Sequence, residues 1–183
     1  MFSKNLEAAM TEQIKHELYS AYLYLSMSAW AESNNMPGAA KWLGKQAQEE
    51  QEHALTFYGY VHDRGGKVIL QAIPQPPAEF TSLLDLFEQV KEHEAKVTGL
   101  INRLYEIALK ENDYAGQDML QWFVSEQVEE EKNAATIVDA LRHVGTQGAA
   151  LFMVDRWLGE RYSGCSSGNV EKPGFQIETW FLV

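Results

Sequence analysis

Four long stretches of the sequence carry apolar residues at alternating steps of four and three. This spacing places the apolar side chains along one face of an α-helix. Helix breakers are scarce within these stretches and gather in the segments between them. A helix with one apolar face must bury that face against another element. The pattern therefore predicts an all-α fold in which four long helices share one core.

The breaker-rich segments set the expected helix boundaries. The segments 34–38 and 111–113 are short turns, so the helices on either side of each should be antiparallel neighbours. The segment 64–82 holds a glycine pair and a cluster of prolines, which predicts a long extended connection. We expect helices at about 4–33, 38–63, 81–110 and 114–144, and a shorter fifth helix at about 148–162.

Polar residues mark the starts of two of these helices and the end of the expected domain. Thr81 or Ser82 is placed to cap the third helix, and Asp113 to cap the fourth, by accepting a hydrogen bond from a free backbone N–H. Residues 1–162 are expected to form one domain. Residues 163–183 read as a flexible linker followed by the apolar segment FQIETWFLV, an extension whose role the sequence leaves open.

Each of the four apolar stripes is interrupted near its middle by residues of metal-ligand type. The interruptions are Glu17, Glu50 with His53, Glu94, and Gln127 with Glu130. In a bundle of helices of similar length, these positions fall at one level. The sequence thus predicts a polar layer inside an otherwise apolar core.

A buried layer of four carboxylates needs a source of positive charge. An isolated buried charge is costly, and several carboxylates together repel one another. Two divalent cations would balance the four negative charges, with His53 and Gln127 as neutral ligands. The spacing of three between Glu50 and His53 sets both side chains on one side of a rigid helix. We therefore predict a two-metal site.

The ligand types narrow the choice of metal without fixing it. Carboxylates with one imidazole suit iron, manganese or zinc. Carboxylate sites inside helix bundles are typical of di-iron and di-manganese proteins. Tyr24 follows Glu17 by seven residues on the same stripe. Its phenol can hydrogen-bond a ligand carboxylate or donate an electron, and an ordinary core tyrosine is the alternative.

Composition limits the classes of partner and site. Twenty-six acidic against fifteen basic residues give a net charge of −11, which repels nucleic acid and attracts cations. The single cysteine, Cys165, excludes an internal disulfide and a cysteine-cluster metal site. The sequence has neither a signal-peptide pattern nor an apolar run near the roughly 20 residues of a membrane helix. We expect a cytoplasmic protein without membrane or nucleic-acid partners.

Four fragments resemble the non-haem ferritins of bacteria and archaea. They are ELYSAYLYLSMSAW at 17–30, QAQEEQEHA at 46–54, EHEAKVT at 92–98 and LQWFVSEQVEEEK at 120–132. The resemblance extends over residues 1–162. It implies a ferritin-like four-helix bundle whose long crossover joins the second and third helices, with a short fifth helix at the C-terminal end.

The resemblance also implies roles for individual residues. Glu17 and His53 would hold one iron, Glu50 would bridge, Glu94 and Gln127 would hold the second iron, and Glu130 would lie beside it. The family's third iron site would fall on Glu49, Glu126 and Glu129. The stripes alone do not predict this third site, because these acids lie one step off them and otherwise read as a solvated helix face.

Related di-iron families fit the sequence less well. Bacterioferritins resemble two copies of Glu-x-x-His with a haem-binding methionine on the second helix. Here the fourth helix has Gln127-x-x-Glu130 and the second has no methionine, so we expect no haem. Rubrerythrins need more cysteines, the small DNA-protecting relatives lack a fifth helix, and large di-iron oxygenases need longer chains.

The implied activity is that of a ferroxidase. It would oxidise Fe²⁺ with O₂ or H₂O₂ at the paired site and store the ferric product as an oxyhydroxide mineral. The resemblance implies a hollow homo-oligomeric cage of 24 subunits around that mineral. Two alternatives stay open: a di-iron oxidase or oxygenase that acts on another substrate, and a non-catalytic helical scaffold.

Overall fold

The computed structural model describes residues 2–145 and 148–161. Within these ranges the regular elements are five helices, which confirms the predicted all-α class. The helices are α1 (Lys4–Ser33), α2 (Pro37–Asp63), α3 (Leu83–Lys110), α4 (Tyr114–Val144) and α5 (Gly148–Arg161). Tyr162 and the extension 163–183, with Cys165, lie outside the described residues.

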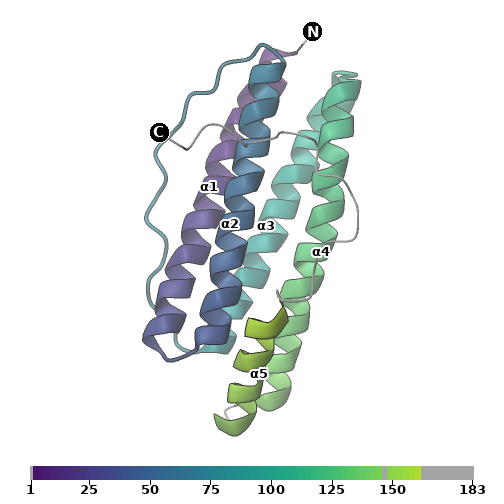
Figure 1. The fold of residues 1–183 in the computed structure, drawn as a ribbon. Coiled ribbons are helices and arrows are strands. Elements are labelled where there is room, and N and C mark those ends of the chain that lie inside the picture. Colours follow the sequence, from purple (N-terminus) through teal and green to yellow (C-terminus); the bar gives the residue numbers. More distant parts are fainter. Residues whose placement is uncertain (1, 146–147, 162–183) are drawn as a thin grey trace.

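Two antiparallel helix pairs form the bundle. Helix α1 packs on α2, α3 packs on α4, and α1 also contacts α3. The connection between α2 and α3 runs the length of the bundle along the outer side of α1 (Figure 1). Because this crossover returns the chain to the end where α2 began, α2 and α3 run in the same direction. The predicted topology with one long crossover is confirmed.

Helices α1, α4 and α5 begin at the expected residues, whereas the starts of α2 and α3 differ by one or two residues for reasons that lie in the first turn. Helix α2 begins at Pro37 rather than at 38, because the first helical position needs no N–H donor and tolerates proline. Helix α3 begins at Leu83 rather than at 81, since Ser82 is its cap and accepts from the Asp85 N–H at 3.0 Å. Asp113 caps α4 as expected, through a 2.8 Å bond from the Gly116 N–H.

The core consists of two apolar clusters that lie at opposite ends of the bundle. One contains Leu6, Met10, Phe57, Ile101 and Leu120, among others, and the second contains Met27, Leu43, Phe87, Ile137 and Leu158. In each long helix, one cluster takes residues before mid-helix and the other takes residues after it. The polar residues in the middle of the helices therefore separate two apolar halves.

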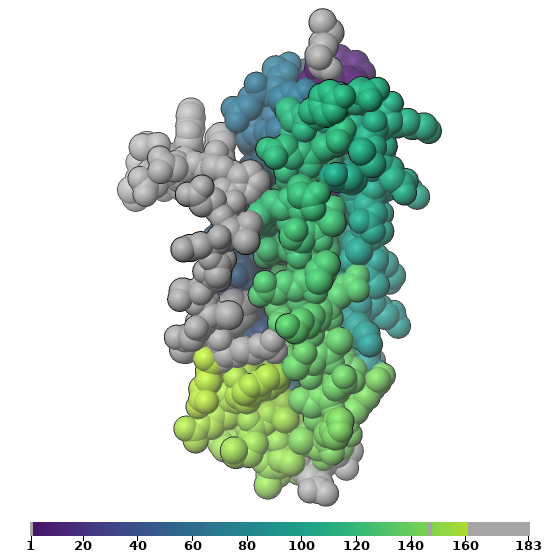
Figure 2. Space-filling view, turned by 90° about the vertical axis from the view of Figure 1, so that its right-hand side faces the viewer, coloured from purple at the N-terminus to yellow at the C-terminus, as the bar shows by residue number. Residues whose placement is uncertain are grey.

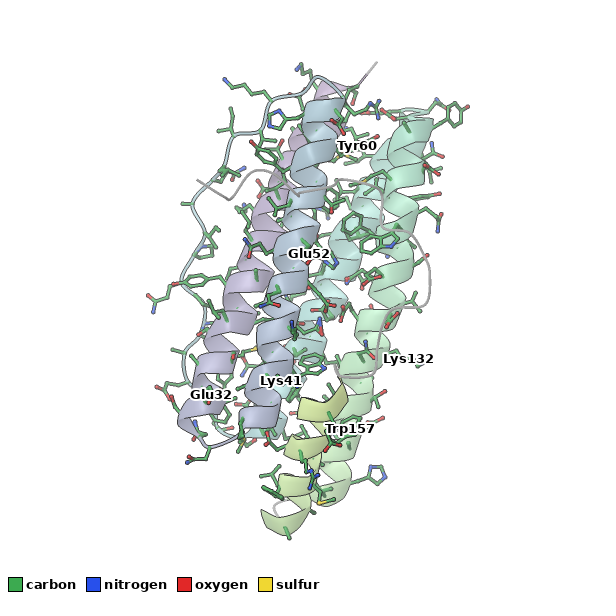
Figure 3. All side chains as sticks on the ribbon, viewed as in Figure 1. Glu32, Lys41, Glu52, Tyr60, Lys132 and Trp157 are labelled. Atoms are coloured by element: carbon green, nitrogen blue, oxygen red, sulfur yellow. The ribbon has the colours of Figure 1, made fainter. Side chains whose placement is uncertain are left out.

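Helix α5 packs against the start of α2 and the end of α4. Figure 2 shows α5 at the foot of α4, and Figure 3 labels Trp157 on α5 and Lys41 on α2 at the same end of the bundle. The buried Asp155 carboxylate accepts bonds from the Gly38 N–H at 3.1 Å and the Ala39 N–H at 2.8 Å. A side chain from α5 thus satisfies free N–H groups in the first turn of α2.

The approach of α5 to α2 requires a glycine. A Cβ on Gly38 would lie 1.7 Å from the carbonyl oxygen of Asp155, and a Cβ on Gly159 would lie 3.1 Å from the Gly38 Cα. The Lys41 ammonium donates to the Gly159 carbonyl at 2.7 Å. These contacts fix the position of α5, which the sequence left open. Among the described helices, none is long and apolar enough to span a membrane.

Candidate metal centre

Six predicted ligands lie between the two apolar clusters. Glu17, Glu50, His53, Glu94, Gln127 and Glu130 are all at most 6 % exposed. They come from four different helices, and Glu52, labelled halfway along α2 in Figure 3, stands between Glu50 and His53 in the chain. The six side chains are therefore buried in the middle of the bundle, where the stripes place them.

Three of these residues form the tightest group. One ligand atom each from Glu17, Glu50 and His53 lies within 4.8 Å of the other two. The His53 Nδ1 is 3.5 Å from Glu50 Oε2. Gln13, one turn before Glu17, donates from Nε2 to Glu17 Oε1 at 2.8 Å and orients that carboxylate. An acid from α1 and an acid–imidazole pair from α2 thus converge at distances that a single cation can span.

Glu94 is held by donors from two other helices. The Tyr24 hydroxyl donates to Glu94 Oε1, and Gln127 Nε2 donates to Glu94 Oε2 at 3.2 Å. Glu94 lies outside the group of three, but its charge raises the pKa of Glu50. The carboxylate of α3 therefore faces the same layer as the carboxylate of α2. Tyr24 serves as a hydrogen-bond donor to a candidate ligand, one of the two roles expected of it.

Glu130 completes the layer from α4. Its Oε1 accepts from Gln46 Nε2 at 3.3 Å, and the same nitrogen donates to Glu49 Oε2 at 2.9 Å. Burial raises the pKa of Glu130 well above the ordinary value, and the charges of Glu94 and Glu50 raise it further. Glu130 is therefore close enough to both acids to share one electrostatic environment with them.

Burial makes all four acids resist ionisation. It is the first cause of the raised pKa values of Glu17, Glu50, Glu94 and Glu130. Repulsion by a neighbouring carboxylate adds to each shift, while the bonds from Tyr24 and Gln127 counteract it at Glu94. In the metal-free protein, burial and mutual repulsion therefore favour protons on these carboxyl groups. A bound cation would replace them.

Several buried polar atoms in the layer lack a hydrogen-bond partner in the described part of the protein and could be satisfied by a cation. Glu50 Oε2, His53 Nε2 and Gln46 Oε1 have no hydrogen-bond partner among the described residues. Buried groups of this kind are rare, because leaving one unsatisfied costs about 1–3 kcal/mol. Carboxylate oxygens with an imidazole nitrogen are also a ligand set that iron accepts. The residues present therefore fit a buried metal site.

The acids that the ferritin resemblance assigns to a third site lie at the margin of the layer. Glu49 and Glu126 are partly buried, and their charges raise the pKa values of Glu50 and Glu130. Glu129 is exposed. The structure thus brings Glu49 and Glu126 near the layer, whereas no described contact joins Glu129 to it.

Sequence reasoning assigned no role to several polar residues in and around the layer. Gln13 and Gln46 bind ligand carboxylates, and Ser20 bonds the His93 Nε2 at 2.7 Å. Burial lowers the pKa of His93 to about 4, so this ring is neutral at pH 7. Gln46 lies on the predicted stripe of its helix and could have been noticed there. Gln13, Ser20 and His93 lie off the stripes, where no periodic signal marks them.

Comparisons with known proteins agree with this architecture. A family model described as a ferritin-like domain matches residues 7–144. The chain is 42% identical to a bacterial non-heme ferritin of Campylobacter jejuni over 158 residues, which is 86% of this chain and 95% of the relative. It is 43% identical to a bacterial non-heme ferritin of Bacteroides fragilis over 161 residues, which is 88% of this chain and 100% of the relative.

A solved structure gives the same result in three dimensions. The open-pore ferritin of the hyperthermophilic archaeon Archaeoglobus fulgidus superposes with a TM-score of 0.86 at 44% identity. The match covers 87% of this chain and 98% of that one. A family match over most of the chain and relatives above 40% identity support one assignment. This chain belongs to the ferritin-like domain family.

Proposed function

We propose that this protein stores iron and is a ferroxidase, which oxidises Fe²⁺ with O₂ or H₂O₂ and keeps the ferric product as an oxyhydroxide mineral. One observation carries the proposal: two acids and a histidine from two helices place ligand atoms within 4.8 Å of one another inside the core. The non-heme ferritins among the relatives support the same activity.

Each member of the layer has a proposed role toward the iron substrate. Glu17 and His53 hold one iron, Glu50 bridges, and Glu94 with Gln127 holds the second. Glu130 lies beside the second iron. The support is that all six side chains are buried between the two apolar clusters and that the charges of Glu50, Glu94 and Glu130 act on one another. Two cations would neutralise the four carboxylates.

Pairing the irons matches the electron count of the reaction. Each Fe²⁺ loses one electron on oxidation, so two irons supply the two electrons that reduce O₂ to peroxide. A separation of about 3.5–4 Å is usual for two-metal sites. Hydrolysis of the ferric product then releases protons to water. Tyr24, which donates to Glu94, is positioned to orient that ligand or to supply a further electron.

A third iron site at Glu49, Glu126 and Glu129 belongs to the same proposal. Two of these acids act electrostatically on Glu50 or Glu130, which supports a cation position at the edge of the layer. Such a position would let iron leave the paired site in the direction of the mineral. We infer no haem, because α2 contains no methionine of the kind that binds haem in bacterioferritins.

We further propose that the protein assembles as a cage of 24 copies around the mineral. An open hollow of about 430 Å³ between α1 and the crossover is lined by Tyr22, Leu25 and Ile73, among others. Ile69 and Leu70, which also belong to the crossover, are more than 60 % exposed. Exposed apolar surface of this kind is typical of a contact between proteins. The acidic net charge of −11 would attract Fe²⁺ toward the shell.

The proposal places this activity in residues 1–162 and in the cytoplasm. The match of the ferritin-like domain to residues 7–144 supports the first part. Residues 163–183 follow that unit in the sequence and lie outside the described residues. The charge balance supports neither a nucleic-acid nor a membrane partner.

Aerobic addition of Fe²⁺, followed by particle mass, tests the function. The proposal predicts fast oxidation and a particle that retains far more iron than two per chain. A di-iron oxidase acting on another substrate would stop near two irons per chain, and a scaffold would show no fast oxidation. Glu94→Gln should lose the fast phase. Glu92→Gln, which changes an exposed acid on the same helix, should keep it.

A further inference from the structure

Gln46 connects the buried layer to the acids at its edge. It lies on α2, one turn before Glu50, and is 1 % exposed. Its Nε2 donates to Glu49 Oε2 at 2.9 Å on its own helix and to Glu130 Oε1 at 3.3 Å on α4. One amide group therefore holds together an acid of the layer and an acid assigned to the third site.

This bridge uses the full donor capacity of the amide. An NH₂ group has two hydrogens, and here each has its own carboxylate. Two carboxylates placed side by side repel each other, and the Glu49 charge is among the causes that raise the pKa of Glu130. The amide donors between them offset part of that repulsion. They hold both carboxylates in place before a cation binds.

The other end of the amide has no such partner. Gln46 Oε1 is buried and accepts no hydrogen bond from the described residues. A buried carbonyl without a donor is unfavourable. It becomes satisfied when a cation, or a water bound to a cation, takes a position beside it. The amide donors and the free carbonyl oxygen of Gln46 therefore both fit a cation bound next to Glu130.

We propose that Gln46 is a positioning residue for cation binding at Glu130 and that it couples this position to Glu49. Its amide N–H groups orient the two carboxylates, and its carbonyl oxygen coordinates the bound cation or accepts a hydrogen bond from a water ligand of that cation. This inference rests on the proposed iron-handling function and extends it. Partners that orient metal ligands typically change metal affinity by about 10–100-fold when they are removed.

Anaerobic titration calorimetry with Zn²⁺ as a redox-silent probe tests the proposal on the full chain. Gln46→Leu keeps a similar shape but has neither donors nor an acceptor. We expect the weaker class of Zn²⁺ sites to lose about 10-fold in affinity. Gln48→Leu is the matched control, because it removes an exposed glutamine two residues away on the same helix. Equal affinity in the two variants would overturn the proposal.

A double-variant cycle separates positioning from a general structural effect. If Gln46 acts through Glu130, then Gln46→Leu should lower the Zn²⁺ affinity less than twofold when Glu130→Gln is already present. If the double variant instead loses Zn²⁺ affinity by the product of the two single-variant factors, the proposal is contradicted. A wild-type protein that binds no Zn²⁺ would instead overturn the proposed function itself, so the two failures are distinguishable.

Gln46→Glu gives a second test if the leucine variant folds poorly. It keeps the shape and an oxygen acceptor but replaces both donors with a further acid. The metal-free protein should melt several degrees lower than the wild type, and saturating Zn²⁺ should remove most of that difference. An unchanged melting temperature in the metal-free protein would contradict the role of the amide donors.

Discussion

The Tyr24 hydroxyl and the Glu94 carboxylate form a hydrogen bond inside the bundle, between α1 and α3, where both residues are 1 % exposed. Gln127 on α4 donates to the other oxygen of the same carboxylate at 3.2 Å. Both donors lower the pKa of Glu94 against the larger effect of burial, which raises it. They thus hold one candidate ligand in a defined orientation and partly prepare it for ionisation.

Tyr24→Phe should weaken metal binding while it leaves the fold intact. The ring keeps its packing against Trp42 and His93, but Glu94 loses one of its two donors. We expect about 10-fold lower affinity for the second Zn²⁺ equivalent, the usual scale for a lost ligand-orienting partner. Anaerobic calorimetry measures this. If Tyr24 is only a core residue, the affinity will not change.

Gln127→Glu should slow the release of ferric product. An amide is a neutral and weaker ligand than a carboxylate, which would hold Fe³⁺ more tightly. The variant should oxidise a first addition of Fe²⁺ and then turn over more slowly in repeated additions. Stopped-flow absorbance over successive additions checks this. Equal rates in every addition for the variant and the wild type would count against a release role for Gln127.

The layer should make the stability of the metal-free protein fall as pH rises. The folded-state pKa of Glu17 is raised well above 4.5, by burial first and then by the Glu50 charge. A group with a raised pKa holds its proton in the folded state after the unfolded chain has lost it. Its contribution is therefore complete below the ordinary glutamate pKa and is lost as pH rises toward the folded value.

Glu17→Gln isolates this effect, because glutamine does not titrate. Its melting temperature relative to the metal-free wild type should rise between pH 5 and pH 8. The increase in melting temperature on adding Zn²⁺ to the wild type should also be larger at pH 8, since the cation displaces protons. Differential scanning calorimetry at several pH values measures both. A stability difference that stays constant with pH would contradict a proton-holding layer.

Gly38→Ala should loosen α5 from α2. The added Cβ would lie 1.7 Å from the carbonyl oxygen of Asp155, which is backbone and has little room to move. Overpacking of this kind typically costs about 1–3 kcal/mol, or roughly 2–4 °C of melting temperature per kcal/mol in a chain of this size. Thermal unfolding of the metal-bound protein checks the prediction.

Gly99→Ala is the matched control for that variant. Gly99 is a helical glycine of α3, and a Cβ there would meet nothing within 4 Å. Alanine is the better helix former by about 1 kcal/mol, so this variant should be as stable as the wild type or more so. If both glycine variants lose stability equally, the close approach of α5 is not the cause.

The bundle and its polar layer could be predicted because both depend on periodicity within single helices. The spacing of Glu50 and His53 follows from the geometry of one helix, and the level of Glu17 and Glu94 follows from similar helix lengths. Breakers marked the crossover and the turns. The starts of α2 and α3 were displaced slightly, because Pro37 is accepted in a first turn and Ser82 lies outside the helix that it caps.

The supporting contacts could not be predicted, because they depend on which helices become neighbours. Gln46 bonds Glu130 across 84 positions of sequence, and Asp155 bonds the N–H of Ala39 across 116. Nothing in the local pattern around Asp155 indicates that it will satisfy the first turn of another helix. Such contacts are set only by the packed fold, in which the apolar stripes determine which helices lie side by side.

Anomalous diffraction from crystals soaked anaerobically in Fe²⁺ or Zn²⁺ tests the central claim most directly. Two cations should appear between the two apolar clusters, each bound by oxygen or nitrogen atoms at the usual distance of about 2.0–2.2 Å for Zn²⁺. Glu17, Glu50, His53 and Glu94 should be among the ligands. Cations bound only at exposed acids, with the layer still closed by its own hydrogen bonds, would contradict the account.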